Sequence, residues 1–364
     1  MRRKAGWIRL ELLLVFVPAA LAVRFLAPDR HVWIFGASVL ALLPLAAYIG
    51  HATEALAERL GGGIGGLLNA TFGNATELII GALALREGLP DLVKASLTGS
   101  IIGNVLLVFG AAALAGGFNR PEQRFNRTAA SLGTTMLLLS AVGLIVPAVF
   151  HHLASGLHGV ELRLDTEIAV VLLATYCLSL VFTLRTHRTL FGTPVPVEDR
   201  RRRPNHDVPT RRWVLLLIGA TVAVAIVSEL LVGAVTETAR VLGWTELFVG
   251  VVVVAIVGNA AEHYSAVTLA MRNQMDASIA IAVGSSTQIA LFVGPALVLL
   301  SYVIAPRPMN LLFSTFELVA IAVAVLSIAF IAHDGETHWM EGVQLLAVYA
   351  ILCLGFYFLP PGLI

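Results

Sequence analysis

Charged residues are scarce in this sequence. Asp, Glu, Lys and Arg make up 13% of its 364 residues, against roughly 25% in soluble domains. Hydrophobic residues make up 58%, and the mean hydropathy is +0.86, so a lipid bilayer is the natural solvent for most of the chain. The two cysteines, Cys177 and Cys353, stand in apolar runs, which favours packing over a disulfide or a metal pair. The net charge of +1 gives no reason to expect nucleic acid as a partner.

Long polar stretches are also scarce. One long interruption, between Arg185 and Arg212, contains four consecutive arginines and four prolines, and predicts a linker over residues 186–212. The remaining sequence consists of apolar stretches long enough to cross a hydrocarbon core about 30 Å thick. We expect eleven spans, near residues 8–27, 31–59, 66–86, 91–117, 128–150, 164–185, 213–235, 244–271, 275–304, 310–332 and 338–359.

The first span follows a basic N-terminus, as a signal peptide would. A small-x-small cleavage site before Asp29 is missing, so we interpret residues 1–30 as a retained leading transmembrane helix. With eleven spans, 17 of the 24 Lys and Arg residues fall on the side of the linker and 7 on the opposite side. This bias predicts a cytoplasmic N-terminus and a cytoplasmic linker.

An internal repeat relates the two halves of the chain. The run Gly73-Asn74-Ala75-Thr76-Glu77 matches Gly258-Asn259-Ala260-Ala261-Glu262. A Gly-Ser pair follows each run at the same spacing of 26 residues, as Gly99-Ser100 and Gly284-Ser285. Without the leading helix, residues 31–185 and 213–364 hold five spans each, so the halves enter the membrane from opposite sides. The sequence therefore predicts an all-α integral membrane protein with two inverted-topology five-helix repeats, typical of secondary transporters with a site at the midplane.

Each repeated motif places an acidic residue within a span. Glu77 and Glu262 are flanked by apolar sequence, and an ionised carboxylate in the membrane costs several kcal/mol unless it is paired or hydrated, which favours a functional role. Asn74 and Asn259 lie three residues earlier, on the same helix face. The glycine that opens each motif permits a bend, which frees backbone carbonyls as ligands. Such an oxygen-only site suits Ca²⁺, whereas zinc prefers histidine or cysteine.

The same carboxylates can carry protons. Two negative charges balance one divalent ion or take up as many as two protons, so occupancy by metal and by protons is mutually exclusive. The alternative role, ion pairing with arginine to hold the bundle together, is disfavoured because no arginine stands in mid-span near either acid.

Other polar residues stand at related places in the two halves. We expect Asn104 and Gln288 to join the site. Ser100, Ser285, Ser286, Gly73 and Gly258 are expected to support it or to pack the helices, and Glu54 and Glu229, on the first span of each repeat, to line the pathway.

The repeats resemble those of a known family. Residues 73–110 and 258–293 look like the two α-repeats of the cation/proton exchangers, within the wider Ca²⁺/cation antiporter superfamily, and the resemblance covers nearly the whole chain. It implies export of Ca²⁺ from the cytosol in exchange for protons by alternating access. It also implies cation binding by Glu77 and Glu262, with the first span of each repeat as a moving gate. Sodium-driven relatives usually carry Thr-Ser-x-Pro-Glu, and the motifs here lack that proline.

One departure concerns the linker, which in many family members carries a strongly acidic helix. Here three acidic residues stand against eight arginines from Arg185 to Arg212, so a Ca²⁺-collecting surface is not expected.

Three alternatives remain open at this stage. They are a sodium-coupled Ca²⁺ exchanger, a channel, and an intramembrane metalloenzyme built on His151, His152 and His158 or on His333, Asp334, Glu336, His338 and Glu341. His333 and His338 are five apart and do not share a helix face, which disfavours the metalloenzyme. We therefore expect a transporter rather than an enzyme, with Ca²⁺ and protons as substrates and no cofactor. We expect it in a prokaryotic inner membrane and leave a homo-oligomer open.

Overall fold

The chain folds into a bundle of long helices. The computed structural model describes residues 10–60, 62–153, 158–187 and 209–360. The first half contains η1 (Leu12–Val15), α2 (Phe16–Leu26), α3 (His31–Leu60), α4 (Gly62–Phe72), α5 (Ala75–Arg86), α6 (Pro90–Ile102), η2 (Gly103–Val108), α7 (Phe109–Gly117), β1 (Gln123–Arg124), α8 (Arg127–Leu153), α9 (His158–Val181) and η3 (Phe182–Thr186). The second half contains α12 (Thr210–Leu242), α13 (Glu246–Phe248), η4 (Val249–Val254), α14 (Ala255–Gly258), α15 (Ala260–Met271), α16 (Met275–Gln288), η5 (Ile289–Val293), α17 (Gly294–Ile304), α18 (Thr315–Asp334), β2 (Glu336–Thr337) and α19 (Trp339–Phe358).

The helices follow the predicted spans closely. Within the described residues, eight helices are long and apolar enough to cross a membrane, or nine when the bent pair Glu246–Gly258 and Ala260–Met271 counts as one span. The other two predicted spans fall on the shorter helix Leu12–Leu26 and on the pair α4 and α5. The count of eleven therefore stays a prediction, and most of the predicted linker lies outside the described residues.

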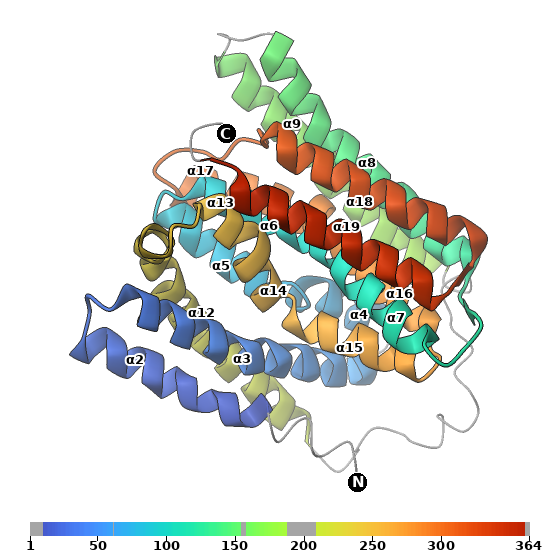
Figure 1. The fold of residues 1–364 in the computed structure, drawn as a ribbon, viewed down its shortest axis with the longest axis horizontal. Coiled ribbons are helices and arrows are strands. Elements are labelled where there is room, and N and C mark those ends of the chain that lie inside the picture. Colours follow the sequence, from blue (N-terminus) through green and yellow to red (C-terminus); the bar gives the residue numbers. More distant parts are fainter. Residues whose placement is uncertain (1–9, 61, 154–157, 188–208, 361–364) are drawn as a thin grey trace.

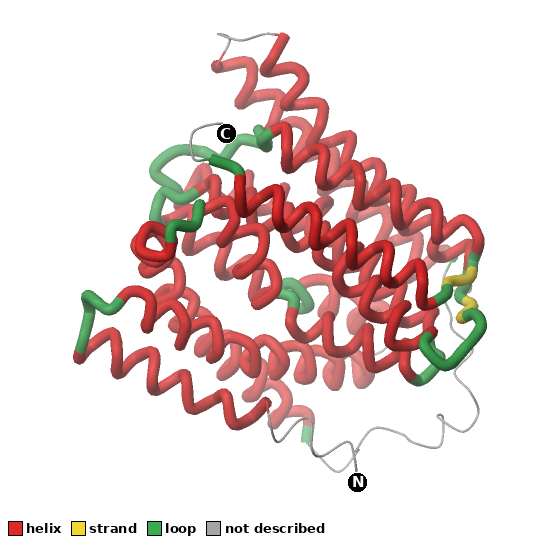
Figure 2. The backbone as a smooth tube through the Cα atoms, in the orientation of Figure 1, coloured by secondary structure: helices red, strands yellow, loops and turns green. Residues whose placement is uncertain are grey.

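The two halves are interleaved in space. α3 of the first half packs along α12 of the second, and α7 packs against α15 and α19 (Figure 1). α6 crosses η4 so closely that a Cβ on Gly99 would lie 2.0 Å from the carbonyl oxygen of Val251. Glycine is therefore required at this crossing. The close approach holds the two motif regions together at the centre of the bundle, where the tube of Figure 2 shows a short non-helical stretch.

A small strand pair departs from the predicted all-helical fold. β1 and β2 pair antiparallel, with Gln123 opposite Thr337 and Arg124 opposite Glu336. Gly335 ends α18 with φ of +79°, a left-handed conformation that glycine adopts without strain. The chain turns there and runs extended beside the loop of the other half. The ribbon thus ties the two halves together, and pairings of this kind between distant loops have no signal in the sequence.

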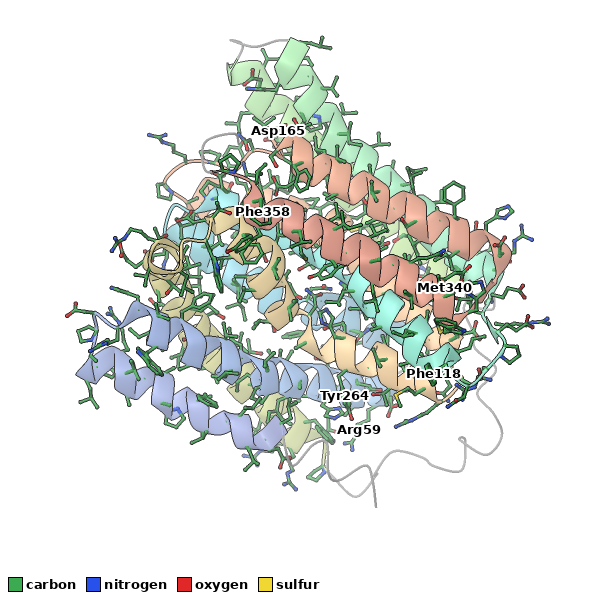
Figure 3. The ribbon with its side chains drawn as sticks, viewed as in Figure 1. Arg59, Phe118, Asp165, Tyr264, Met340 and Phe358 are labelled. Atoms are coloured by element: carbon green, nitrogen blue, oxygen red, sulfur yellow. The ribbon has the colours of Figure 1, made fainter. Side chains whose placement is uncertain are left out.

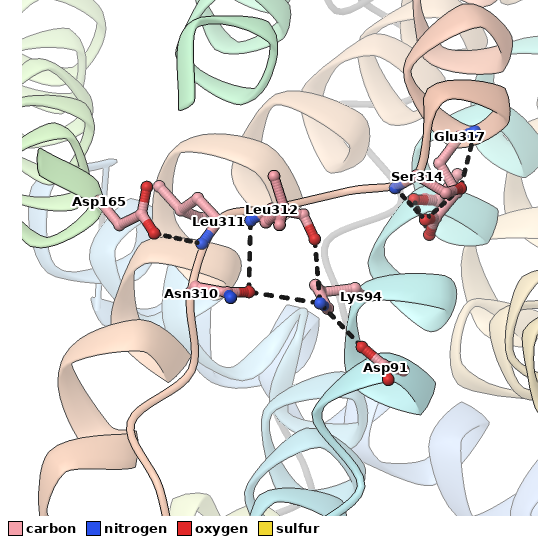
Figure 4. Close-up of polar contacts among 9 residues, drawn as sticks. Asp91, Lys94, Asp165, Asn310, Leu311, Leu312, Ser314 and Glu317 are labelled. Carbon is pink, nitrogen blue, oxygen red and sulfur yellow. Dashed lines mark hydrogen bonds and ion pairs between the residues drawn. The ribbon is translucent and has the colours of Figure 1, made fainter. Parts of the chain in front are cut away.

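A second loop ties the halves together between α17 and α18. Lys94 of α6 donates to the carbonyl oxygen of Leu312 at 2.9 Å and to Asn310 Oδ1 at 3.3 Å. Asp165 of α9 accepts from the backbone N–H of Leu311 at 3.2 Å (Figure 4). Side chains from the first half therefore hold the largely buried part of this loop, residues 309–314, which belongs to the second half.

Candidate cation site

The two repeated motifs lie at helix breaks. Asn74 is the N-cap residue of α5, two residues after the end of α4, and Asn259 is the N-cap residue of α15, directly after α14. At the second break the chain bends by 61°. Glu77 and Glu262 are consequently in the first turn of their helices, where the helix dipole stabilises negative charge. The bend expected from the glycines is present at the second motif, with the asparagine as the residue outside the helix.

The Glu77 carboxylate lies against the second motif. Its side chain is 6% exposed, and a Cβ on Gly258 would lie 3.2 Å from Glu77 Oε1. Glu262 is half-buried and stands four residues after Gly258, in the first turn of α15. The structure therefore brings together the two predicted acids, one from each half.

Asparagine side chains connect the halves beside the acids. Asn259 is fully buried and donates through Nδ2 to Ser100 Oγ at 2.8 Å and to the Ala255 carbonyl at 2.9 Å. Asn104 donates through Nδ2 to Asn259 Oδ1 at 3.1 Å and to Ser285 Oγ at 3.0 Å. Ser100 and Ser285, predicted as support or packing, thus accept hydrogen bonds from the amides across the interface.

The remaining predicted residues, Gln288, Ser286 and Gly73, make contacts of different kinds. Asn74 Nδ2 donates to Gln288 Oε1 at 2.6 Å, so Gln288 joins the first motif from the opposite half. Ser286 donates to the carbonyls of Ala282 at 2.9 Å and Ile101 at 3.3 Å, which is a helix-packing contact. Gly73 is limited by its own turn, because a Cβ there would lie 2.6 Å from the Asn69 carbonyl oxygen.

Several acceptor oxygens in this cluster lack a donor. Both carboxylate oxygens of Glu77, together with Asn74 Oδ1 and Asn104 Oδ1, are buried and accept no hydrogen bond from the described part of the chain. A buried acceptor without a donor costs about 1–3 kcal/mol, and more when it is charged. A cation coordinated by these oxygens would supply the missing interaction, so the donor set fits a hard metal ion.

A further buried acid, Glu317, was not predicted from the sequence, and its carboxylate oxygens differ from those of Glu77 because they have hydrogen-bond donors. Glu317 is 2% exposed, and its Oε1 accepts from Thr98 Oγ1 at 3.0 Å. Its Oε2 accepts from the N–H and the hydroxyl of Ser314, at 2.9 and 2.8 Å, in a capping box at the start of α18 (Figure 4). Its oxygens are satisfied by protein donors, as expected of a structural carboxylate. The Ser-x-x-Glu spacing was the available sequence signal.

Glu54 and Glu229 make their ion pairs with residues outside the central cluster. Both side chains are exposed, on α3 and α12 respectively. Glu54 lies 3.9 Å from His51 Nδ1 on its own helix, whereas Glu229 Oε1 lies 2.8 Å from Arg86 Nη2 of α5. Both acids are therefore accessible on the first helix of each half, and their place on the pathway stays a prediction.

Two π-helical turns beside the site were also missed. η2 begins one residue before Asn104, and η5 begins one residue after Gln288. Extra residues in a helical turn often mark functional sites, because they reorient neighbouring side chains. The period of apolar residues does not reveal such turns.

The alternative metal cluster around His333 and His338 does not form in the described part of the chain. Among the described residues, no three His, Cys, Asp or Glu side chains are arranged to hold a metal ion. His338 and Glu341 instead make a capping box at the start of α19, and His333 lies 3.7 Å from Asp334. The side chains of His152 and His158 lie outside the described residues.

Comparison with known proteins identifies close relatives. A family model described as sodium/calcium exchanger protein matches residues 30–185 and 212–358. The chain is 45% identical over 361 residues to a Ca²⁺/H⁺ antiporter of Synechocystis sp., with 96% of each chain covered. It is 42% identical to the Ca²⁺/H⁺ antiporter ChaA of Bacillus subtilis, covering 90% of this chain and 92% of that one. The solved structure of native YfkE superimposes with a TM-score of 0.80 at 39% identity, covering 95% of this chain and all of YfkE.

Proposed function

The chain belongs to the sodium/calcium exchanger protein family and is a multi-pass membrane protein, and on this premise we propose that it exchanges Ca²⁺ for protons. The proposal is supported by two relatives named Ca²⁺/H⁺ antiporters, which match this chain over nearly its whole length. It rests above all on the buried oxygens of Glu77, Asn74 and Asn104, which accept no hydrogen bond within the described residues.

The cation is bound by oxygens from both halves. Glu77 and Glu262 supply the charge that balances a divalent ion, and the amide oxygens of Asn74 and Asn104 complete the set. Asn259, Gln288, Ser100 and Ser285 orient those amides through the hydrogen bonds described above. An all-oxygen set of variable geometry is what Ca²⁺ prefers.

Proton exchange follows from the same two carboxylates. When the ion leaves, two like charges remain together in a poorly solvated place, and proton uptake removes their repulsion. Each carboxylate then carries either a proton or a share of the ion. The two substrates therefore compete for one site, as an exchanger requires.

Access to the site alternates between the two sides of the membrane. Inverted halves allow this, because exchanging their conformations exposes a midplane site to the opposite side. With the linker in the cytoplasm, a proton gradient directed inward drives Ca²⁺ out of the cytosol. The corresponding location is a prokaryotic inner membrane.

Flux measurements in proteoliposomes test the site. We expect Glu77→Gln and Glu262→Gln each to abolish Ca²⁺ uptake driven by a pH gradient, since each removes a ligand charge and a proton carrier. Glu122→Gln, which removes an exposed carboxylate paired with Arg124, is the matched control and is expected to retain wild-type flux. Near-normal flux in either site variant would contradict the assignment.

Ion replacement separates the rival functions. An absolute requirement for sodium would identify a sodium-coupled exchanger instead. Failure of a pH gradient to accumulate Ca²⁺ against its own gradient would favour a channel.

A further inference from the structure

α3 and α12, which we call arms, are the first long helices of the two halves. The eight residues 49–56 of α3 and the eight residues 224–231 of α12 show the same alternation of buried, half-buried and exposed positions. Within them, Thr53 and Ser228 are fully buried, and each is followed by an exposed glutamate, Glu54 or Glu229. The two acids therefore stand at matching points of this burial pattern, on helices that run in opposite directions.

One of these acids is held by the opposite half. Glu229 Oε1 lies 2.8 Å from Nη2 of Arg86, the last residue of the first motif helix, α5. α12 packs directly against α5, so this ion pair joins an arm of the second half to the motif helix of the first. Arg86 also lies 3.5 Å from its neighbour Glu87, but Glu229 is the partner from another helix.

The equivalent pair at the other end of the molecule is open. Arg272 directly follows α15, the second motif helix, just as Arg86 ends the first. It is exposed and forms no ion pair within the described part of the chain. Its counterpart Glu54 contacts only His51 of its own helix, at 3.9 Å, among the described ion pairs.

Glu54 and Arg272 nevertheless lie on neighbouring helices. A Cβ on Gly50 of α3 would lie 3.5 Å from the Cβ of Ala261 in α15. From this contact onward, α3 and α15 run in the same direction (Figure 1). Figure 3 shows Arg59, near the end of α3, on the same side of the molecule as Tyr264 of α15. Glu54 is about 6 Å and Arg272 about 16 Å beyond the contact along the helix axes. A sliding movement of α3 along α15 would bring the carboxylate to the guanidinium group.

We propose that Arg86–Glu229 and Arg272–Glu54 are alternating latches, each formed while the other is broken. This inference rests on the proposed exchange function, because inverted halves expose one site to two sides only by exchanging their conformations. In the present structure the Arg86–Glu229 pair is formed at one end of the molecule, which we call the Arg86 face. The Arg272–Glu54 pair at the other end, the Arg272 face, is open. The reverse state has the Arg272–Glu54 pair closed and the Arg86–Glu229 pair separated.

The exposure of both pairs suits this role. Arg86 and Glu229 are 49% and 61% exposed, and ion pairs in such settings are weak. A weak latch biases the two states without trapping either of them. We therefore expect the loss of one latch to change the ratio of the two states by about two- to five-fold.

Distance measurements on spin-labelled protein test the latches. The full chain, with Cys177 and Cys353 replaced by serine, is labelled at Val241 and Arg307 to report on the Arg86 face. Arg307 follows Pro306, which packs near Gly88 just beyond Arg86. Leu60 and Met271 report on the Arg272 face in a second labelled protein. Both pairs are measured in lipid nanodiscs by pulsed electron spin resonance.

Opposite effects are expected from the two arginines. Arg86→Gln should lower the fraction of molecules with a short Val241–Arg307 distance two- to five-fold, and Arg272→Gln should raise it. Exchanging the charges, as Arg86→Glu with Glu229→Arg, should restore the wild-type distribution. Arg163→Gln, which breaks an exposed arginine–glutamate pair within α9, is the matched control and should change neither distance.

Other outcomes would overturn the latches. These are shifts in the same direction for both arginines, no shift for either, failure of the charge exchange, or an equal shift in the control. The distances do not depend on which ion is carried. A failure here with intact Ca²⁺/H⁺ exchange would refute the latches alone, and the converse result would refute the proposed function alone.

Discussion

Gly258 determines how near the Glu77 carboxylate comes to the second motif. The glycine leaves space that a methyl group would fill, since its Cβ would stand 3.2 Å from Oε1 and 3.4 Å from Cδ of Glu77. Either the carboxylate or the helix break must then move by a few tenths of an ångström. Ligand distances to a metal ion are more exacting than ordinary packing contacts, so function should be affected before folding.

The residue-scale prediction is that Gly258→Ala weakens Ca²⁺ binding. We expect the Kd, measured by isothermal titration on the purified protein, to rise about ten-fold, equivalent to about 1.4 kcal/mol. Gly103→Ala is the control, because this buried glycine precedes Asn104 but has nothing within 4 Å of its Cβ position. Equal affinities in wild type and Gly258→Ala would show that this close approach does not shape the site.

At the scale of elements, the crossing of α6 and η4 holds the two motif regions in register. Gly99 of α6 faces the Val251 carbonyl, and Gly250 of η4 faces Ala95, whose Cβ would lie 2.5 Å from a Cβ at Gly250. Small residues of this kind let membrane helices pack backbone against backbone, where van der Waals contact replaces the hydrophobic effect. Asn104 and Ser100 are carried by the same continuous helical segment, so the crossing also sets their distance from Asn259.

The repeat provides an internal control for this crossing. Gly99→Ala should lower the Tm of the detergent-purified protein, because overpacking a core costs about 1–3 kcal/mol. Gly284→Ala changes the corresponding glycine of the second half, where nothing lies within 4 Å, and should leave Tm unchanged or slightly raised. A Tm for Gly99→Ala equal to that of Gly284→Ala would contradict the close crossing.

For the whole molecule, the main consequence is competition between protons and Ca²⁺. In the pH range in which the site carboxylates take up protons, lowering the pH neutralises the charge that binds Ca²⁺. The Ca²⁺ affinity should therefore fall as the pH falls. Competition with one proton changes the Kd about ten-fold per pH unit, and competition with two changes it about a hundred-fold.

We predict that the Kd for Ca²⁺ falls about ten- to a hundred-fold per pH unit as the pH rises through the range in which the site carboxylates lose their protons. Glu262→Gln should reduce the slope by about one decade per unit if it leaves binding measurable. Titrations at several pH values measure both slopes. A Kd independent of pH in the wild type would exclude coupling through these carboxylates.

Particular residues show what the sequence revealed and what it did not. Glu77, Glu262, Asn74 and Asn259 were found because the repeat places them twice at the same spacing in apolar surroundings. Glu317 was missed because a single acid near a predicted span end has no second copy to mark it. Its hydrogen bond from Thr98 joins residues 219 positions apart.

The elements themselves were predictable to within about seven residues at either end, since apolar length and charge-poor composition determine which segments enter a bilayer. The strand pair β1–β2 and the π-helical turns η2 and η5 were not. The first depends on two distant loops meeting, and the second on small changes in helical hydrogen bonding that leave the apolar pattern intact.

By itself, the sequence determined the membrane class, the order of the helices and the duplicated acidic motifs, because hydrophobicity and repetition are properties of the chain. Only the tertiary structure decided which oxygens share one place, and which of them accept no hydrogen bond from the described residues. It alone also decided that Glu229 is paired with arginine while Glu54, among the described residues, is not. These outcomes depend on how two oppositely oriented halves pack, and packing is determined by contacts between residues far apart in the chain.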